Sequence, residues 1–189
     1  MQVTVIEAAP RILARVACTE TADWFRALHT AHGVTIREGT GLARLTGAGA
    51  VTGAILTDGT EIPADLAIAG IGIEPDTALA AAAGLAIDNG IATDAQGRTS
   101  DPAIWAAGDC ASFPQGAGRL RLESVPNAIA MAECVAANIL GAATPYTPDP
   151  WFWSDQYDVK LQIAGLGTGA TRIAVRDTAP ARSHWYYAG

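Results

Sequence analysis

The chain has 189 residues, 50% of them hydrophobic, and a formal net charge of −7. This length suffices for one or two domains with a packed core. The acidic balance, with no basic run, argues against nucleic acid and against an anionic membrane surface as partners. Three widely separated cysteines, with no C-x-x-C pair, exclude a disulfide framework, a zinc finger and a dithiol pair, and favour a reducing cytoplasm. The longest apolar run, residues 66–73, is too short to span a bilayer.

The first predicted element is a buried parallel strand over residues 3–6, with Glu7 at its carboxyl end. A dinucleotide-binding unit keeps the carboxylate that grips a ribose 2′-hydroxyl at this place, and begins about 20 residues earlier with a glycine-rich turn. Here only Met1 and Gln2 come before the strand. Surface acids at strand ends are also common, so Glu7 alone leaves both interpretations open.

The next elements alternate between helix and strand. Apolar residues recur at helical spacing over residues 19–32, and Gly33 supplies the stop, so we expect an amphipathic helix followed by a short strand at residues 34–36. Asp58-Gly59 predicts a hairpin turn, and residues 66–73 predict a buried strand. This order belongs to an α/β domain with a parallel sheet.

After that strand, Gly70-Ile71-Gly72 predicts either close backbone approach to a bound nicotinamide or a tight turn. Further elements are then expected in chain order: an Ala-rich segment at residues 79–86, a hairpin at 87–98, an apolar strand ending at Gly108-Asp109, a helix at 126–140 closed by Gly141, a proline-rich linker at 143–150, and strands within 151–189, including 159–164 and 171–175.

Three of these features have a chemical interpretation beside a structural one. Asp109 can accept hydrogen bonds from polyol hydroxyls, and Gly108 lets the backbone pass close to a ligand. The helix that starts near Pro126 offers unpaired N–H groups to a developing negative charge, or is an ordinary helix. Trp153 fills a core or covers an aromatic cofactor.

Taken in order, the segments VTVIEAAPRIL, LTDGTEIPADLAIAGIGIEP, TSDPAIWAAGDCA, ESVPNA and PWFWSDQY resemble the FAD-dependent NADH:ferredoxin reductases that serve oxygenases, the putidaredoxin and rhodocoxin reductase group. The resemblance covers essentially the whole chain. It implies an internal fragment with partial Rossmann-like NAD and FAD domains, a parallel sheet with helices plus β-hairpins, and then the start of an α+β C-terminal domain. The boundaries expected are 1–75 for the rest of the NAD domain, 76–147 for the second half of the FAD domain and 148–189 for the C-terminal domain.

The resemblance also implies roles for individual residues. Glu7 would hold the adenosine ribose of NADH, with Arg11 and Arg15 near the phosphates or adenine, and an acid there favours NADH over NADPH. Ile71 and Gly72 would line the nicotinamide. The flavin would be contacted by the following residues: Gly108 and Asp109 at the ribityl chain, with Cys110 and Ala111 beside them, Ser124, Val125 and Pro126 at the pyrimidine end, and Trp153, the catalytic candidate, beside the isoalloxazine ring.

The implied activity is transfer of a hydride from NADH to FAD, and then of single electrons to a two-iron, two-sulfur ferredoxin that feeds an oxygenase. The glycine turns that cradle both pyrophosphates are missing, so the fragment is expected to need the N-terminal FAD half or another copy of the chain. The helix that faces ferredoxin in relatives has no Lys or Arg here, which leaves Arg119, Arg121 and Lys160 as basic candidates for docking. The alternative is a non-catalytic α/β remnant that acts as an interaction or assembly module.

Overall fold

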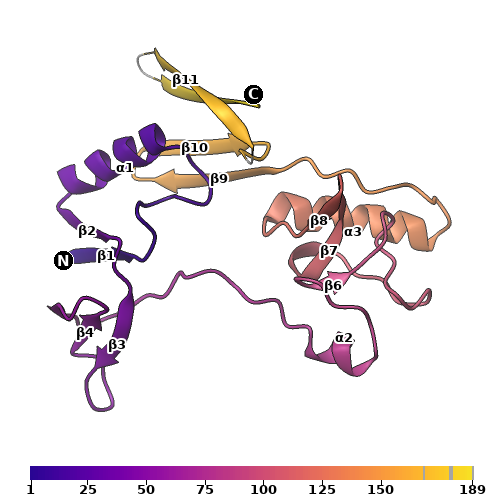
Figure 1. Ribbon diagram of the computed structural model, residues 1–189, viewed down its shortest axis with the longest axis horizontal. Coiled ribbons are helices and arrows are strands. Elements are labelled where there is room, and N and C mark those ends of the chain that lie inside the picture. The colour runs from indigo at the N-terminus through magenta and orange to yellow at the C-terminus, as the bar shows by residue number, and fades with distance from the viewer. Residues whose placement is uncertain (168, 179–180, 189) are drawn as a thin grey trace. The chain divides into compact units, whose positions relative to one another are not determined.

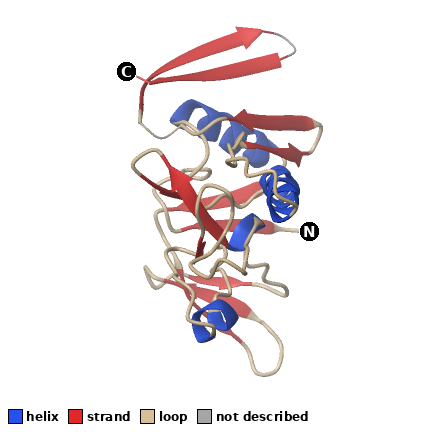
Figure 2. Cartoon of the chain, turned by 90° about the vertical axis from the view of Figure 1, so that its right-hand side faces the viewer, coloured by secondary structure: helices blue, strands red, loops and turns tan. Residues whose placement is uncertain are grey.

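The structure, a computed structural model, describes residues 1–167, 169–178 and 181–188 (Figure 1). The chain forms two units. The first unit contains residues 1–71 and 167–189, and the second contains residues 72–166. Short strands and hairpins joined by long loops make up most of both units (Figure 2).

The first unit begins with a parallel strand pair. Strand β1 (Val3–Glu7) lies beside β2 (Val34–Glu38), and the register places Glu7 opposite Glu38. Helix α1 (Thr19–Ala31) connects the two strands and buries Phe25 and Ala22 on its inner side. Gly33 follows in the left-handed region, with φ +81°. The predicted strand, helix and strand all form, although β2 continues two residues further than expected. The predicted burial of the first strand is wrong: Val3 and Val5 are 37% and 38% exposed, because β2 is the only described strand that pairs with β1.

Two further sheets complete the first unit. Strands β3 (Leu42–Thr46), β4 (Gly53–Leu56) and β5 (Glu61–Pro63) form an antiparallel sheet. Asp58 closes the predicted β4–β5 turn, because its Oδ1 accepts the Thr60 N–H at 2.9 Å. Strands β11 (Ala170–Thr178) and β12 (Ala181–Ala188) form an antiparallel hairpin.

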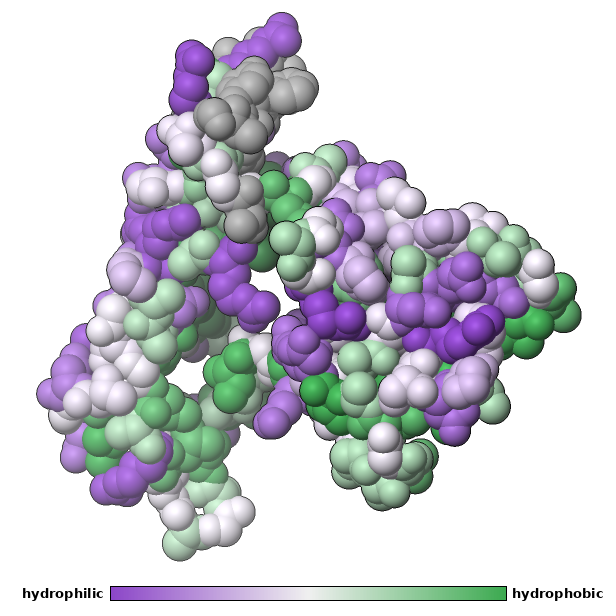
Figure 3. Space-filling model, turned by 45° about the vertical axis from the view of Figure 1, so that its right-hand side comes forward, coloured by the Kyte–Doolittle hydropathy of each residue, from purple (hydrophilic) through white to green (hydrophobic). Residues whose placement is uncertain are grey.

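The buried strand predicted at residues 66–73 is wrong. No strand forms there, and Ile68 and Ile71 are 88% and 94% exposed. A buried parallel strand needs hydrogen-bonded neighbours. None of the strands that the structure describes pairs with this run. The apolar side chains of this segment are therefore exposed. Other hydrophobic residues are also exposed on the surface of the molecule (Figure 3).

The second unit is built around helix α3 (Val125–Ile139), which confirms the predicted second helix. Met131 and Val135 of this helix pack against Phe113 and Ala111 of strand β7 (Ala111–Gln115). Strand β7 pairs in parallel with β6 (Ile91–Ala92) and antiparallel with β8 (Gly118–Leu120). The remaining elements are α2 (Ala78–Ala82) and the antiparallel hairpin of β9 (Trp151–Gln156) and β10 (Val159–Ala164).

Two predictions in this unit need correction. The segment before Asp109 is not a strand: Gly108–Cys110 is a 3-10 turn, and the strand starts after it at Ala111. The expected hairpin at 87–98 is reduced to a single antiparallel bridge between Ile87 and Ile91. The reason is that β6 uses its hydrogen bonds for β7, a strand distant in sequence.

Within the described part of the chain, no helix is both long and apolar enough to cross a membrane.

Candidate functional site

Except for Trp153, which is on β9, the predicted flavin-binding residues lie where the 3-10 turn meets the start of α3. Gly108 is buried with φ +79°, and a Cβ built on it would lie 3.5 Å from the Ala128 Cβ. That distance is an ordinary van der Waals contact, so the glycine is required here by its positive φ, which other residues adopt only with strain. Asp109 is exposed, and among the described residues no protein donor bonds its carboxylate. Its two oxygens are therefore available to the hydroxyl groups of a polyol.

The first turn of α3 has one capped and one open N–H group. Ser124 is the N-cap, and its Oγ accepts the Asn127 N–H at 3.3 Å. Pro126 has no N–H, and the amide of Val125 has no acceptor among the described residues. Val125 is 62% exposed. The open amide and the positive end of the helix dipole favour negative charge at this position.

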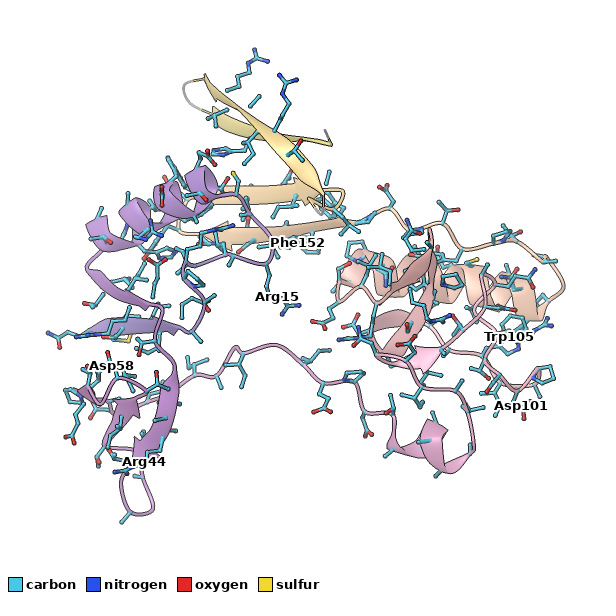
Figure 4. The ribbon with its side chains drawn as sticks, in the orientation of Figure 1. Arg15, Arg44, Asp58, Asp101, Trp105 and Phe152 are labelled. Atoms are coloured by element: carbon cyan, nitrogen blue, oxygen red, sulfur yellow. The ribbon has the colours of Figure 1, made fainter. Side chains whose placement is uncertain are left out.

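Trp153 projects from the exposed face of β9. It is 46% exposed, and its ring stacks on Trp151, with centroids 5.0 Å apart and ring planes 28° from parallel. The intervening Phe152 points to the opposite, half-buried face, since successive side chains alternate along a strand (Figure 4). The two indoles thus form a flat aromatic surface of the kind that stacks on a planar ring.

At the predicted nucleotide end, Glu7 terminates β1 and shapes the loop that follows. Its Oε1 accepts the Ala9 N–H at 2.7 Å. Oε2 has no partner in the part of the chain that the structure describes. One oxygen therefore fixes the side chain, and the other remains available to a hydroxyl donor.

The two nearby arginines differ in their surroundings. Arg11 is committed to the main chain, since its Nη2 donates to the Ala17 carbonyl at 2.7 Å and its Nη1 lies near the Ile12 and Cys18 carbonyls. Arg15 is exposed, and no hydrogen bond or ion pair holds its guanidinium among the described residues (Figure 4). Of the two, Arg15 is the one placed to reach a phosphate.

Ile71 and Gly72 lie on an exposed segment that forms no strand. Gly72 has φ +93°, a conformation that glycine adopts without strain. Two surface hollows, of about 400 and 270 Å³, lie at residues 74–78 and along β3–β5, and neither is lined by a predicted cofactor residue.

The structure also changes the interpretation of Arg119 and Arg121. Arg119 donates to the Thr93 carbonyl at 2.7 Å and to the main chain and hydroxyl of Ser112. The Arg121 side chain is 8% exposed and forms a 2.7 Å ion pair with Glu123. Both guanidinium groups are engaged inside the unit, so they are poor docking groups for an acidic partner.

Sequence reasoning missed the ion pair between Glu38 and Arg26. Glu38 accepts the Ile12 N–H at 2.7 Å and two N–H groups of Arg26, and this arrangement fixes the loop after Glu7. The Arg26 guanidinium, the largest influence, lowers the pKa of Glu38. One signal was available: Glu38 ends the strand after Glu7, and the carboxyl ends of parallel strands meet at one edge.

Comparison with known proteins defines the class. Residues 1–132 match the family model described as pyridine nucleotide-disulphide oxidoreductase, and residues 151–189 match a reductase C-terminal domain. The chain belongs to the pyridine nucleotide-disulphide oxidoreductase family. The resemblance drawn from its motifs is confirmed, as is its mixed α/β fold with a parallel pair, hairpins and the start of the C-terminal domain.

Among individual relatives, rhodocoxin reductase from Rhodococcus erythropolis is 45% identical over 93% of this chain and 42% of its own length. Putidaredoxin reductase CamA from Pseudomonas putida is 46% identical over 93% of this chain and 43% of its own. The chain therefore spans less than half the length of these curated relatives.

Solved structures agree with the fold. The ferredoxin reductase for the CYP199A2 system of Rhodopseudomonas palustris superposes with a TM-score of 0.94 at 42% identity, covering 99% of this chain and 48% of that one. A covalent putidaredoxin reductase–putidaredoxin complex gives a TM-score of 0.92 at 43% identity, covering 100% of this chain and 47% of the matched chain.

Proposed function

We propose that this chain supplies part of the NADH site and part of the FAD site of a ferredoxin reductase. The reductase would pass electrons from NADH to a two-iron, two-sulfur ferredoxin that feeds an oxygenase. The observation that carries the proposal is the packing of the Gly108–Cys110 turn against the first turn of α3, which brings Asp109 and the open Val125 amide into one part of the second unit. The names of the relatives support the same reaction.

The residues present fit FAD at this place, because the exposed carboxylate of Asp109, unpartnered among the described residues, stands near a helix N-terminus whose Val125 amide is open. When bound, FAD would supply hydride acceptance and single-electron release. Asp109 would bind ribityl hydroxyls. Ser124, Val125 and Pro126 would present the positive end of α3 to the flavin's pyrimidine end.

Trp153 would cover one face of the isoalloxazine ring and exclude water from it, with Trp151 supporting its ring from behind. Since the side chain contributes only surface and no titrating group, its role in catalysis would be to position the ring and control access.

Residues of the first unit, and Gly72 directly after it in the chain, would hold NADH. Glu7 would accept a hydrogen bond from the adenosine ribose, and Arg15 would approach the phosphates. Ile71 and Gly72 would line the nicotinamide. An NADPH 2′-phosphate would meet the Glu7 carboxylate, which disfavours it.

The docking of ferredoxin would involve groups other than Arg119 and Arg121, which are engaged internally. Lys160 is 74% exposed and pairs with Asp155 at 3.2 Å, an exposed contact that a partner's carboxylate could replace. We also propose the domain limits 1–75, 76–147 and 148–189, with the remaining FAD half supplied by further polypeptide or by another copy of the chain.

The proposal is tested with a protein that contains this chain together with the parts that complete the relatives' length. It should purify with bound FAD, be bleached by NADH without oxygen, and reduce a two-iron, two-sulfur ferredoxin. A colourless, folded protein that does not oxidise NADH would reject the proposal and support the alternative, a non-catalytic interaction or assembly module.

A further inference from the structure

Arg121 contacts three segments that are separate in sequence. Its Nη1 donates to the Asp109 carbonyl at 3.0 Å, its Nη2 lies 2.7 Å from the Glu123 carboxylate, and its Nε lies 3.4 Å from the Asn89 Oδ1. The Arg121 side chain is 8% exposed, although its partners Asn89 and Asp109 lie at the surface. Glu123 directly precedes the N-cap of α3. One guanidinium thus links the Asp109 turn to the helix start.

We propose that Arg121 is a positioning residue that holds Asp109 and the start of α3 in the geometry needed for flavin binding. The inference rests on the proposed function, since it assigns Asp109 and the α3 N-terminus to FAD. A planar guanidinium suits this role because it donates in several fixed directions at once.

The turn at residues 89–90 also packs against Arg121 and the 3-10 turn. A Cβ built on Gly90 would lie 2.7 Å from the Cys110 carbonyl oxygen and 3.0 Å from the Arg121 Cδ. Asn89 has φ +50°, an unusual conformation for a residue other than glycine. The turn at residues 89–90 therefore packs tightly on both the 3-10 turn and the Arg121 stem, and leaves little room for either to shift.

The ion pair also sets the charge beside the helix. With Arg121 present, the Glu123 carboxylate is neutralised at 2.7 Å. Without it, a net negative charge would remain next to the end of α3 where reduction of the flavin builds negative charge. Loss of Arg121 should therefore lower the flavin reduction potential as well as loosen Asp109.

Arg119 provides a matched control. It lies two positions away and is also engaged internally, but its partners are Thr93, Ser112 and Asp88, none of them at the flavin-binding turn or the α3 cap. Arg119→Gln should loosen the pairing of β6 with β7 and disturb the turn at Gly108–Cys110 less than Arg121→Gln does.

The first measurement needs no flavin. In the protein containing this chain, Arg121→Gln should raise hydrogen exchange at the amide of Ala111, which donates to the Gly108 carbonyl and closes the turn, whereas Arg119→Gln should raise it less. The second measurement is FAD affinity, which Arg121→Gln should weaken by at least about tenfold through the lost charged hydrogen bond. Arg121→Lys should recover part of the affinity. Arg121→Gln combined with Glu123→Gln should recover the reduction potential but not the affinity.

Unchanged exchange at the turn, or FAD affinity within about twofold of the parent protein's, would overturn the positioning role. If Arg121→Gln fails to fold, the comparison of Arg121→Lys with Arg119→Lys decides between the same outcomes. A parent protein that binds no FAD would reject the proposed function instead, and the exchange measurement would still report whether Arg121 holds the turn.

Discussion

Arg26 forms a bidentate ion pair with Glu38: Nη2 lies 2.8 Å from Oε1, and Nε lies 2.9 Å from Oε2. Asp23 contacts the same guanidinium from within helix α1. Because Glu38 ends β2 and also accepts the Ile12 N–H, the pair joins the helix, the strand and the loop that follows Glu7. The Glu38 side chain is 20% exposed, so solvent screens this pair only in part.

The pair predicts a pH-dependent stability. The pKa of Glu38 is lowered from its usual 4.5, chiefly by the Arg26 hydrogen bond. A carboxyl group whose pKa is lower in the folded state than in the unfolded state stabilises the fold. This stabilisation is fully present above the unfolded-state pKa and is lost as the pH falls through the folded-state pKa. Glu38→Gln should therefore lower the free energy of unfolding by about 1–2 kcal/mol at about pH 7 and by much less at about pH 3. Urea unfolding followed by circular dichroism measures both values. Glu61→Gln, an exposed acid on β5, is the control, and an equal loss at both pH values would contradict the assignment.

Cofactor preference tests Glu7. A 2′-phosphate beside this carboxylate would meet a like charge, so the complete reductase should prefer NADH over NADPH by at least about tenfold in kcat/KM, roughly 1.4 kcal/mol. Glu7→Gln keeps an oxygen for the Ala9 N–H but removes the charge, and it should shrink the preference. Steady-state kinetics with both cofactors provides the measurement. Equal use of the two by the parent enzyme would refute the assignment.

Asp109 should be needed to retain the flavin. Asp109→Ala would leave ribityl hydroxyls unpaired, at a cost of about 1–3 kcal/mol in FAD binding. The complete protein should then lose FAD on dilution or gel filtration, as measured by the ratio of flavin to protein absorbance. Asp158→Ala, an exposed acid in the same unit, should retain it. Full retention by Asp109→Ala would mean that Asp109 is only a loop residue.

The exposed apolar run predicts how the 189-residue chain behaves when expressed by itself. Ile68 and Ile71 are almost fully exposed, and no described strand covers the free edge of β1. Such surfaces favour self-association. We expect a colourless, oligomeric or aggregation-prone protein that does not oxidise NADH. In light scattering after gel filtration, the double variant Ile68→Asp, Ile71→Asp should contain a larger fraction of monomer than the unsubstituted chain. Mixing with a separately expressed N-terminal part should restore flavin binding. A monodisperse, yellow, NADH-oxidising monomer would contradict this prediction.

Local sequence patterns correctly predicted the elements whose structure depends on residues close together in the chain. Helix α1 follows from apolar spacing and the Gly33 stop, and α3 follows from Pro126 at its first turn. The β4–β5 turn follows from Asp58-Gly59, since the side chain of Asp58 bonds within its own loop. The family also followed from ordered motifs, because they record a fold that relatives share.

Long-range contacts decided the rest. Residues 66–73 have the composition of a buried strand, but burial requires partner strands, and composition cannot supply them. The segment before Asp109 is also apolar, yet it forms no strand: it leads into the 3-10 turn at Gly108–Cys110, and β7 starts only at Ala111. In sequence, Arg119 and Arg121 are two equivalent exposed cations. Only the folded chain brings Asn89 and Asp109 to Arg121 and so sets this guanidinium apart from that of Arg119, because hydrogen bonds between distant segments exist only after those segments have packed together.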